Sequence, residues 1–304
     1  MNTFKIITAF ILLLRFLITG NAAGSNETSI YKHPLASDQI TDPSMGEIRL
    51  MLGEAGLDKY WDTLKYHILP GFYMVPQMTD ETEIKLGASK IGGHPDMPSS
   101  FEWPSWRNHP MSFVAQINLE EFPMNLVNPG YPATGILYFF YVYDSEVWYN
   151  SDDYDSDKKN NNVVYYSPET TELVRMEPPM TLSEDQIFKS ALLETKLELT
   201  IPDSDYLEAN HLMNNETDLN RYSLEFKPKF LITYDRGIGF RFLGHMTALQ
   251  YGGHPSDEIL LFQADSDDQI GMEWDLSGLL HFFIKADDFK KLFFEKVYTY
   301  RVGT

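Results

Sequence analysis

Two stretches decide the fold: Phe113-Val114-Ala115-Gln116-Ile117-Asn118 and Leu260-Leu261-Phe262-Gln263-Ala264-Asp265. Apolar side chains alternate with others in the first stretch, which is the period of a half-buried strand. Each stretch precedes a glycine-led apolar run, Gly135 to Phe140 in one case and Gly278 to Phe283 in the other. Ahead of them, Ile91-Gly92 parallels Leu243-Gly244. Segments that recur in one order predict a duplicated unit.

The predicted fold class is α+β, with two pseudo-repeated α+β halves and mainly antiparallel sheets. The halves cover about 86–178 and 226–304 of one domain, 86–304, and a variable connector covers 179–225. An N-terminal polar stretch with helices, 23–85, precedes them, because Ser44 and Glu47 have the spacing of a helix start.

Local patterns predict the connector in more detail. We expect a short helix over 183–193, a strand over 196–201 and a helix over 203–213 that Asp203 caps. The polar run 214–220 is expected to be a loop.

The first 22 residues resemble a secretory signal peptide. Lys5 precedes an apolar run, and Gly20-Asn21-Ala22 offers small residues for cleavage. Arg15 interrupts the run, so the alternatives are an uncleaved anchor or an amphipathic helix. Asn26 and Asn215 begin glycosylation sequons, which fit the same route. We therefore expect a secreted or periplasmic protein that no longer contacts the membrane after signal cleavage.

Composition narrows the chemistry further. The chain of 304 residues has no cysteine, which excludes disulfides, thiolate metal sites and cysteine nucleophiles. With 24 Lys and Arg against 44 Asp and Glu, the net charge is −20. Nucleic acid is not an expected partner, because phosphate binding needs clustered cations. A basic protein is the partner that this charge favours.

The motifs also resemble a known family. Ser89-Lys90-Ile91-Gly92-Gly93-His94-Pro95, which leads to Phe101-Glu102-Trp103-Pro104, is similar to the first signature of the YwqG-like family (domain of unknown function 1963). The strands named above and the segment from Trp274 to Ile284 are similar to later signatures. The resemblance implies an α+β fold of two pseudo-repeated halves and no established activity. The family has Gly-Asp-x-Gly after the tryptophan, whereas this chain has Asp275-Leu276-Ser277-Gly278, so Asp275 is the candidate for that acid.

Polar residues on the recurring strands suggest a binding site. Residues two apart in a strand share a face, so Gln116 and Asn118 point together, as do Gln263, Asp265 and Asp267. If the halves meet around a pseudo-two-fold axis, these groups form a polar cleft near the junction. The candidate binding residues are His94, Gln116, Asn118, His245, Gln263, Asp265, Asp267 and Asp275. The alternative is a buried hydrogen-bond network that fixes loop geometry.

Enzyme motifs do not match. The sequence has no Gly-x-Ser-x-Gly elbow and no His-Glu-x-x-His pair, and it implies no cofactor or metal. The Asp-rich run 152–157 lacks the glycine and the final acid of a calcium loop. We therefore expect an exported, non-catalytic binding protein with an acidic surface. The alternative is a hydrolase-like or metal-dependent enzyme that uses Asp265, Asp267 and His94 in the cleft.

Overall fold

The computed structural model describes residues 43–143, 161–234, 238–249, 254 and 256–303. The predicted signal peptide, the sequon at Asn26 and the Asp-rich run 152–157 lie outside these residues. In the described part, no helix combines the length and the apolar character needed to cross a membrane.

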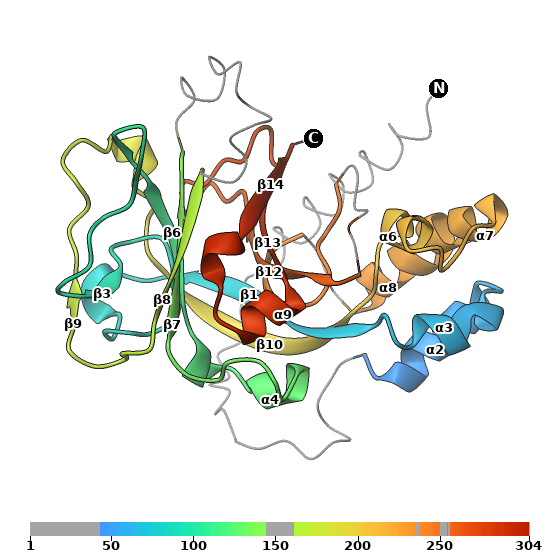
Figure 1. Ribbon diagram of the computed structural model, residues 1–304. Coiled ribbons are helices and arrows are strands. Elements are labelled where there is room, and N and C mark those ends of the chain that lie inside the picture. Colours follow the sequence, from blue (N-terminus) through green and yellow to red (C-terminus); the bar gives the residue numbers. More distant parts are fainter. Residues whose placement is uncertain (1–42, 144–160, 235–237, 250–253, 255, 304) are drawn as a thin grey trace.

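Strands and helices are both present, and one large sheet dominates (Figure 1). The strands of this sheet, in chain order, are β1 (Leu69–Met78), β2 (Lys90–Ile91), β6 (Ser112–Asn118), β7 (Ile136–Tyr141), β8 (Asn162–Ser167), β10 (Ala191–Thr200), β11 (Phe240–Phe242), β12 (Glu258–Asp265), β13 (Leu279–Lys285) and β14 (Tyr298–Val302). Two small sheets pair β3 (Asp96–Pro98) with β9 (Leu173–Arg175), and β4 (Ser105–Trp106) with β5 (His109–Pro110).

The helices are short and lie mainly at one end of the sheet (Figure 1). They are α2 (Met45–Glu54), α3 (Trp61–Leu64), α4 (Met124–Val127), α6 (Ser204–Ala209), α7 (Glu216–Arg221), α8 (Lys227–Thr233) and α9 (Ala286–Lys290). Single 3-10 turns cover Asp58–Tyr60, Glu81–Glu83, Leu119–Glu121, Glu184–Gln186 and Phe294–Lys296, and a π-helical turn covers Tyr222–Phe226. Ser44 and Glu47 form the expected capping box at α2.

The ten strands lie in the order β14-β13-β12-β11-β1-β10-β2-β6-β7-β8. Every pair is antiparallel, which confirms the predicted sheet type. The two longest strands, β1 and β10, form the centre, with Leu69 opposite Thr200 and Met78 opposite Ala191. The range 23–85 therefore supplies a central strand besides helices, and 179–225 supplies the other.

The sheet curls until strands near its two ends face each other across the main core. The ring centroid of Phe139 on β7 lies 4.7 Å from that of Phe262 on β12 and 5.1 Å from that of Phe282 on β13. These side chains belong to one large buried cluster. A second cluster packs the helices α2, α3 and α6–α8 against the region where the central strand β1 begins and β10 ends. Residues that alternate with this core, Gln116 and Gln263 among them, point to the outer face of the sheet.

Two local predictions in the connector were wrong. The predicted helix over 183–193 is a single 3-10 turn, Glu184–Gln186, which is followed by β10. The last three residues of the predicted helix, 191–193, instead begin β10, where each gains a cross-strand neighbour on β1. The predicted loop 214–220 contains α7, because the Asn215 side chain accepts a hydrogen bond from the Asp218 amide and caps a helix there. The helix capped by Asp203 is confirmed as α6.

Candidate functional site

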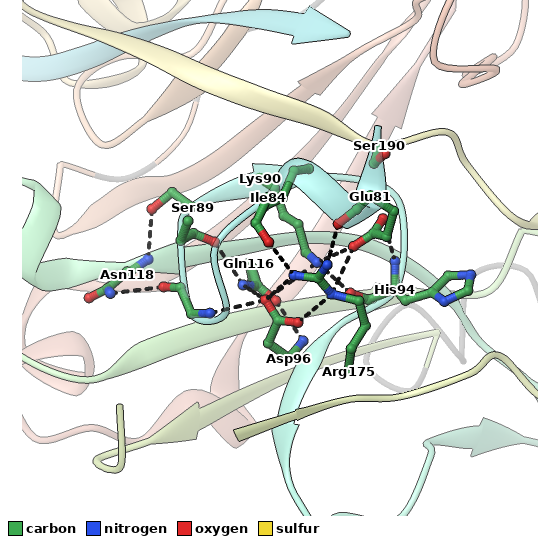
Figure 2. Close-up of polar contacts among 12 residues, drawn as sticks. Glu81, Ile84, Ser89, Lys90, His94, Asp96, Gln116, Asn118, Arg175 and Ser190 are labelled. Carbon is green, nitrogen blue, oxygen red and sulfur yellow. Dashed lines mark hydrogen bonds and ion pairs between the residues drawn. The ribbon is translucent and has the colours of Figure 1, made fainter. Parts of the chain in front are cut away.

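A buried lysine, Lys90, lies within a cluster of polar side chains, the Lys90 cluster (Figure 2). Lys90 on β2 has a fully buried side chain. Its Nζ lies 2.6 Å from Oε1 of Glu81 and 3.4 Å from Oδ2 of Asp96. It also donates a hydrogen bond of 2.5 Å to the carbonyl oxygen of His94. The ammonium is therefore held by two carboxylates and one carbonyl, all within the fold.

A second cation, Arg175 on β9, balances the charge of the two acids. Its Nε donates to Asp96 Oδ1 at 2.8 Å and lies 3.1 Å from Glu81 Oε1. The guanidinium also donates to the carbonyl oxygens of Glu81 and Ile84. Two cations and two carboxylates give a cluster with no net charge, which reduces the cost of burying it.

Gln116 on β6 links this cluster to the backbone. Its Nε2 donates to the carbonyl oxygen of Ala88 at 2.7 Å and to Asp96 Oδ2 at 3.0 Å. Its Oε1 accepts from the Asp96 amide at 2.8 Å. Each polar atom of the amide thus has a partner in the loop that crosses the outer face of β6.

Burial and charge act in opposite directions on the ionisable groups. Burial lowers the pKa of Lys90, although the bond to Glu81 and the charges of Asp96 and Glu81 oppose this change. Burial would raise the pKa of Asp96, but the bond from Arg175 and the charge of Lys90 outweigh it and hold the pKa below its usual value. Asp96 is therefore a carboxylate at neutral pH, and the cluster is ionic.

The loop that carries His94 requires glycine. Gly93 has a φ of +69°, and a Cβ at this position would lie 1.9 Å from Glu81 Oε2 and 2.8 Å from the Cβ of Ser190. The His94 amide donates to the same Glu81 oxygen at 3.2 Å. The Gly92-Gly93 sequence therefore brings the backbone close to Glu81, which explains part of the motif in physical terms.

A matching arrangement lies on the other side of the central strands. Arg241 on β11 pairs with buried Glu198 at 3.1 Å and donates to Thr247 Oγ1 at 2.7 Å. Gln263 on β12 donates to the carbonyl oxygen of Gly239 at 2.7 Å and accepts from the Thr247 amide at 2.8 Å. Gln263 lies opposite Arg241 in the sheet, as Gln116 lies opposite Lys90.

The next strands continue the match. The hydroxyl of Tyr138 on β7 donates to the carbonyl oxygen of Asp96 at 2.5 Å. On β13, Nε2 of His281 lies 3.3 Å from the carbonyl oxygen of Thr247. Tyr138 and Gln116 thus both bind the backbone of Asp96. In the same way, His281 and Gln263 both contact the backbone of Thr247.

The candidate residues from the sequence do not form one cluster. Gln116 belongs to the Lys90 cluster. Gln263 belongs to the arrangement around Arg241, the Arg241 cluster, and four strands separate β6 from β12 in the sheet order. The expectation of a single site between the halves therefore needs correction. Alternation along each strand was sufficient to place the glutamines on one face, but strand order decides whether they meet.

The remaining candidates have local partners. The side-chain Nδ2 of Asn118 donates to the Gly87 carbonyl oxygen, and the backbone N–H of Asn118 donates to the Ser89 hydroxyl oxygen. Nδ1 of His94 lies 3.4 Å from Glu177 Oε2 at the partly exposed end of the cluster. His245 is buried, with Nε2 2.7 Å from the carbonyl oxygen of His67.

The three aspartates lie in or beside the turn between β12 and β13. Asp265 accepts the Trp274 indole N–H at its backbone oxygen, at 3.1 Å. Oδ1 of Asp267 accepts from the amides of Gln269 and Ile270. Asp275 pairs with Arg301 at 3.0 Å. In the part of the chain described here, no group of three His, Asp or Glu side chains has an arrangement that could hold a metal ion.

Four residues of the Lys90 cluster were not among the candidates from the sequence: Glu81, Lys90, Asp96 and Arg175. Lys90 and Asp96 flank the Gly-Gly-His-Pro motif and could have been found as a lysine in an apolar strand and an acid six residues later. Glu81 lies nine residues from Lys90 but outside the motif, and Arg175 lies 79 residues from Asp96, so neither carried a local signal.

One open groove lies at the edge of the sheet, beside β8. It has a volume of about 910 Å³. Its lining residues are Ser105, Trp106, Arg107, Met111, Asn162, Val163, Val164, Tyr165, Tyr166, Leu292, Phe294, Glu295 and Val297. Trp106 is partly buried and lines the groove.

Comparison with known proteins gives one result. The family model described as "Domain of unknown function (DUF1963)" matches residues 89–301. The chain therefore belongs to this family, as its motifs suggested. A search of curated proteins found no match. The matched range begins after β1 and after Glu81, so both a central strand and one carboxylate of the Lys90 cluster come from outside it.

Proposed function

We propose that this member of the DUF1963 family is an exported, non-catalytic binding protein whose partner is a basic protein. The observation that carries the proposal is the open groove beside β8, with aromatic walls and the exposed carboxylate of Glu295. The net charge of −20 supports a basic partner, because long-range attraction increases the rate of encounter with an oppositely charged protein. The signal-like first 22 residues support export.

The state of the ionisable clusters supports a binding role rather than catalysis. Lys90, Asp96 and Arg175 are ionised groups bound to one another, and Gln116 and Gln263 have their amide groups occupied by backbone partners. A general acid or base needs a hydrogen-bonding position open to substrate. These clusters instead fix the loops that cross the outer face of the sheet.

We also propose that the two ends of the sheet descend from one duplicated unit. Lys90 and Arg241, Gln116 and Gln263, and Tyr138 and His281 occupy equivalent strand positions. In this alignment His94 corresponds to His245. Ile91-Gly92 then corresponds to Phe242-Leu243, one residue earlier than the Leu243-Gly244 match made from the sequence. Gly92 and Leu243 then share a positive φ, of +59° and +62°.

The experiment is affinity capture with the immobilised mature chain from its native compartment, at about 0.05 M and about 0.5 M salt. We expect the captured proteins to be basic and to be released at the higher salt. Complexes that persist unchanged in molar salt would count against the proposal. In parallel, a thermal shift panel of divalent metals and small ligands tests for an enzyme, since a specific ligand raises the melting temperature by mass action.

A further inference from the structure

The edge of the sheet at β8 is open to another strand. β8 is the last strand in the sheet order and pairs with β7 alone among the strands of the described residues. A terminal strand presents backbone N–H and C=O groups that a further strand can bind. Its sequence, Asn-Val-Val-Tyr-Tyr-Ser, contains no charged residue and no proline, two of the features that usually protect an edge.

The two faces of β8 are covered by different clusters, and both continue beyond the edge as walls of the groove. On the outer face, Val163 and Tyr165 pack with Trp106. On the inner face, Val164 and Tyr166 pack with Phe294 and Val297. A strand added at this edge would therefore place its side chains alternately against Trp106 and against the segment 292–297.

The wall that carries Trp106 is a tight hairpin. Arg107 and Asn108 join β4 to β5 with φ values of +47° and +69°, as in a two-residue turn with both residues left-handed. The Arg107 guanidinium carbon lies 4.4 Å from the centre of the Trp106 ring. Because the turn is short and Arg107 covers the ring, the tryptophan is held beside the edge, which lowers the entropy cost of binding.

The opposite wall supplies the negative charge of the groove, whereas Arg107 on the hairpin wall is a cation that lies against the Trp106 ring. Glu295 is exposed and lines the groove between Phe294 and Val297, which are both buried. A carboxylate beside an otherwise apolar wall favours Lys or Arg at the facing position of the added strand. The outer wall, by contrast, offers Tyr165 and the accessible part of the half-buried Trp106 to an apolar side chain.

We propose that the groove binds an extended segment of the partner protein as an additional strand on β8, with apolar residues facing Trp106 and basic residues facing Glu295. The six residues of β8 span about 20 Å, so the segment has about six residues in contact. Backbone hydrogen bonds provide affinity, and the alternation of apolar and basic side chains provides specificity. This inference rests on the proposed function and names the partner's binding mode.

The test uses a labelled peptide of ten residues that alternates Val and Lys, blocked at both ends, and measures fluorescence anisotropy with the full mature chain. Two further peptides carry N-methyl groups on the odd or on the even amides. We expect one of the two to bind at least about tenfold more weakly, because about three backbone hydrogen bonds are lost. A peptide with Glu in place of Lys should also bind at least about tenfold more weakly.

Variants locate the site. Trp106→Ala and Glu295→Lys should each weaken binding of the Val-Lys peptide by at least about tenfold. The matched controls Tyr66→Ala and Glu208→Lys, at exposed positions on the helical side, should leave it within about twofold. Glu295→Lys should bind the Val-Glu peptide more tightly than the natural chain does. This residue is exposed, so the variant keeps the test valid even if Trp106→Ala does not fold.

Absence of saturable binding of the Val-Lys peptide at about 1 mM would overturn the inference, since that limit corresponds to only about 4 kcal/mol. Binding that is equal for both N-methylated peptides and the parent, or equal in both groove variants, would overturn it as well. In those cases salt-sensitive capture of a basic partner would still support the proposed function, with a different surface as the site.

Discussion

Lowering the pH should destabilise the protein through a buried histidine. His245 is 4% exposed, and its Nε2 lies 2.7 Å from the carbonyl oxygen of His67. Burial lowers its pKa to about 3; the hydrogen bond to the His67 carbonyl opposes this change, and the charges of His254 and His67 add to it. The folded protein therefore keeps this imidazole neutral at pH values where an unfolded chain already protonates it.

The sign and size follow from these two pKa values. A histidine in an unfolded chain has a pKa of about 6.5. Above that pH both states are neutral and the histidine contributes no pH dependence. Between about pH 6.5 and 3 only the unfolded state takes up the proton, so stability falls by about 1.4 kcal/mol per pH unit. At about pH 4.5 the loss is about 2.7 kcal/mol, which is a large fraction of the stability of an ordinary domain.

The assay is urea unfolding from about pH 7.5 to 4.5, followed by circular dichroism, for the natural chain and for His245→Gln. Glutamine keeps an N–H donor for the His67 carbonyl but does not titrate. The difference in unfolding free energy between the two proteins cancels the carboxylate titrations that they share. It should shift toward the variant by about 2.7 kcal/mol over this range. His211→Gln is the control for replacing an exposed histidine. A difference that stays constant with pH would refute the reasoning.

Three further predictions concern the Lys90 cluster and its counterpart. Lys90→Met should lower the unfolding free energy by about 3–5 kcal/mol, because Asp96 and Glu81 lose a buried cation. Urea titration measures this loss, with Lys285→Met as the control at an exposed lysine. Equal losses in the two variants would contradict the prediction. Gln116→Leu and Gln263→Leu should each lower the unfolding free energy by about 1–3 kcal/mol for every backbone group that loses its partner. Similar decreases in melting temperature for the two variants would support the equivalence of the two sides. Gly93→Ala should destabilise the protein much more than Gly271→Ala, although both glycines have a positive φ, because only at Gly93 would a Cβ clash with Glu81 and Ser190. Equal decreases in melting temperature would argue against the close approach of the Gly93 backbone to these side chains.

The sequence by itself determined the strands and the family. Alternation around Gln116, the continuous apolar run of β7 and the recurring Gly-led segment are local patterns, because a strand's face is set by the period of its own residues. The same patterns indicated an antiparallel, mixed α+β fold. Helix starts at Ser44 and Asp203 were also readable, since a cap involves residues only a few positions apart.

Tertiary structure decided which polar groups meet. Gln116 and Gln263 point to the same face, yet the central pair β1 and β10 lies between β6 and β12 in the sheet and separates them. Glu81 lies only nine residues from Lys90 but outside its motif, and Arg175 binds Asp96 from 79 residues away, so the motif spacing predicts neither. The groove exists only because β8 ends the sheet between a hairpin and the segment 292–297. Strand order is a property of long-range pairing, and residue patterns within a single strand do not encode it.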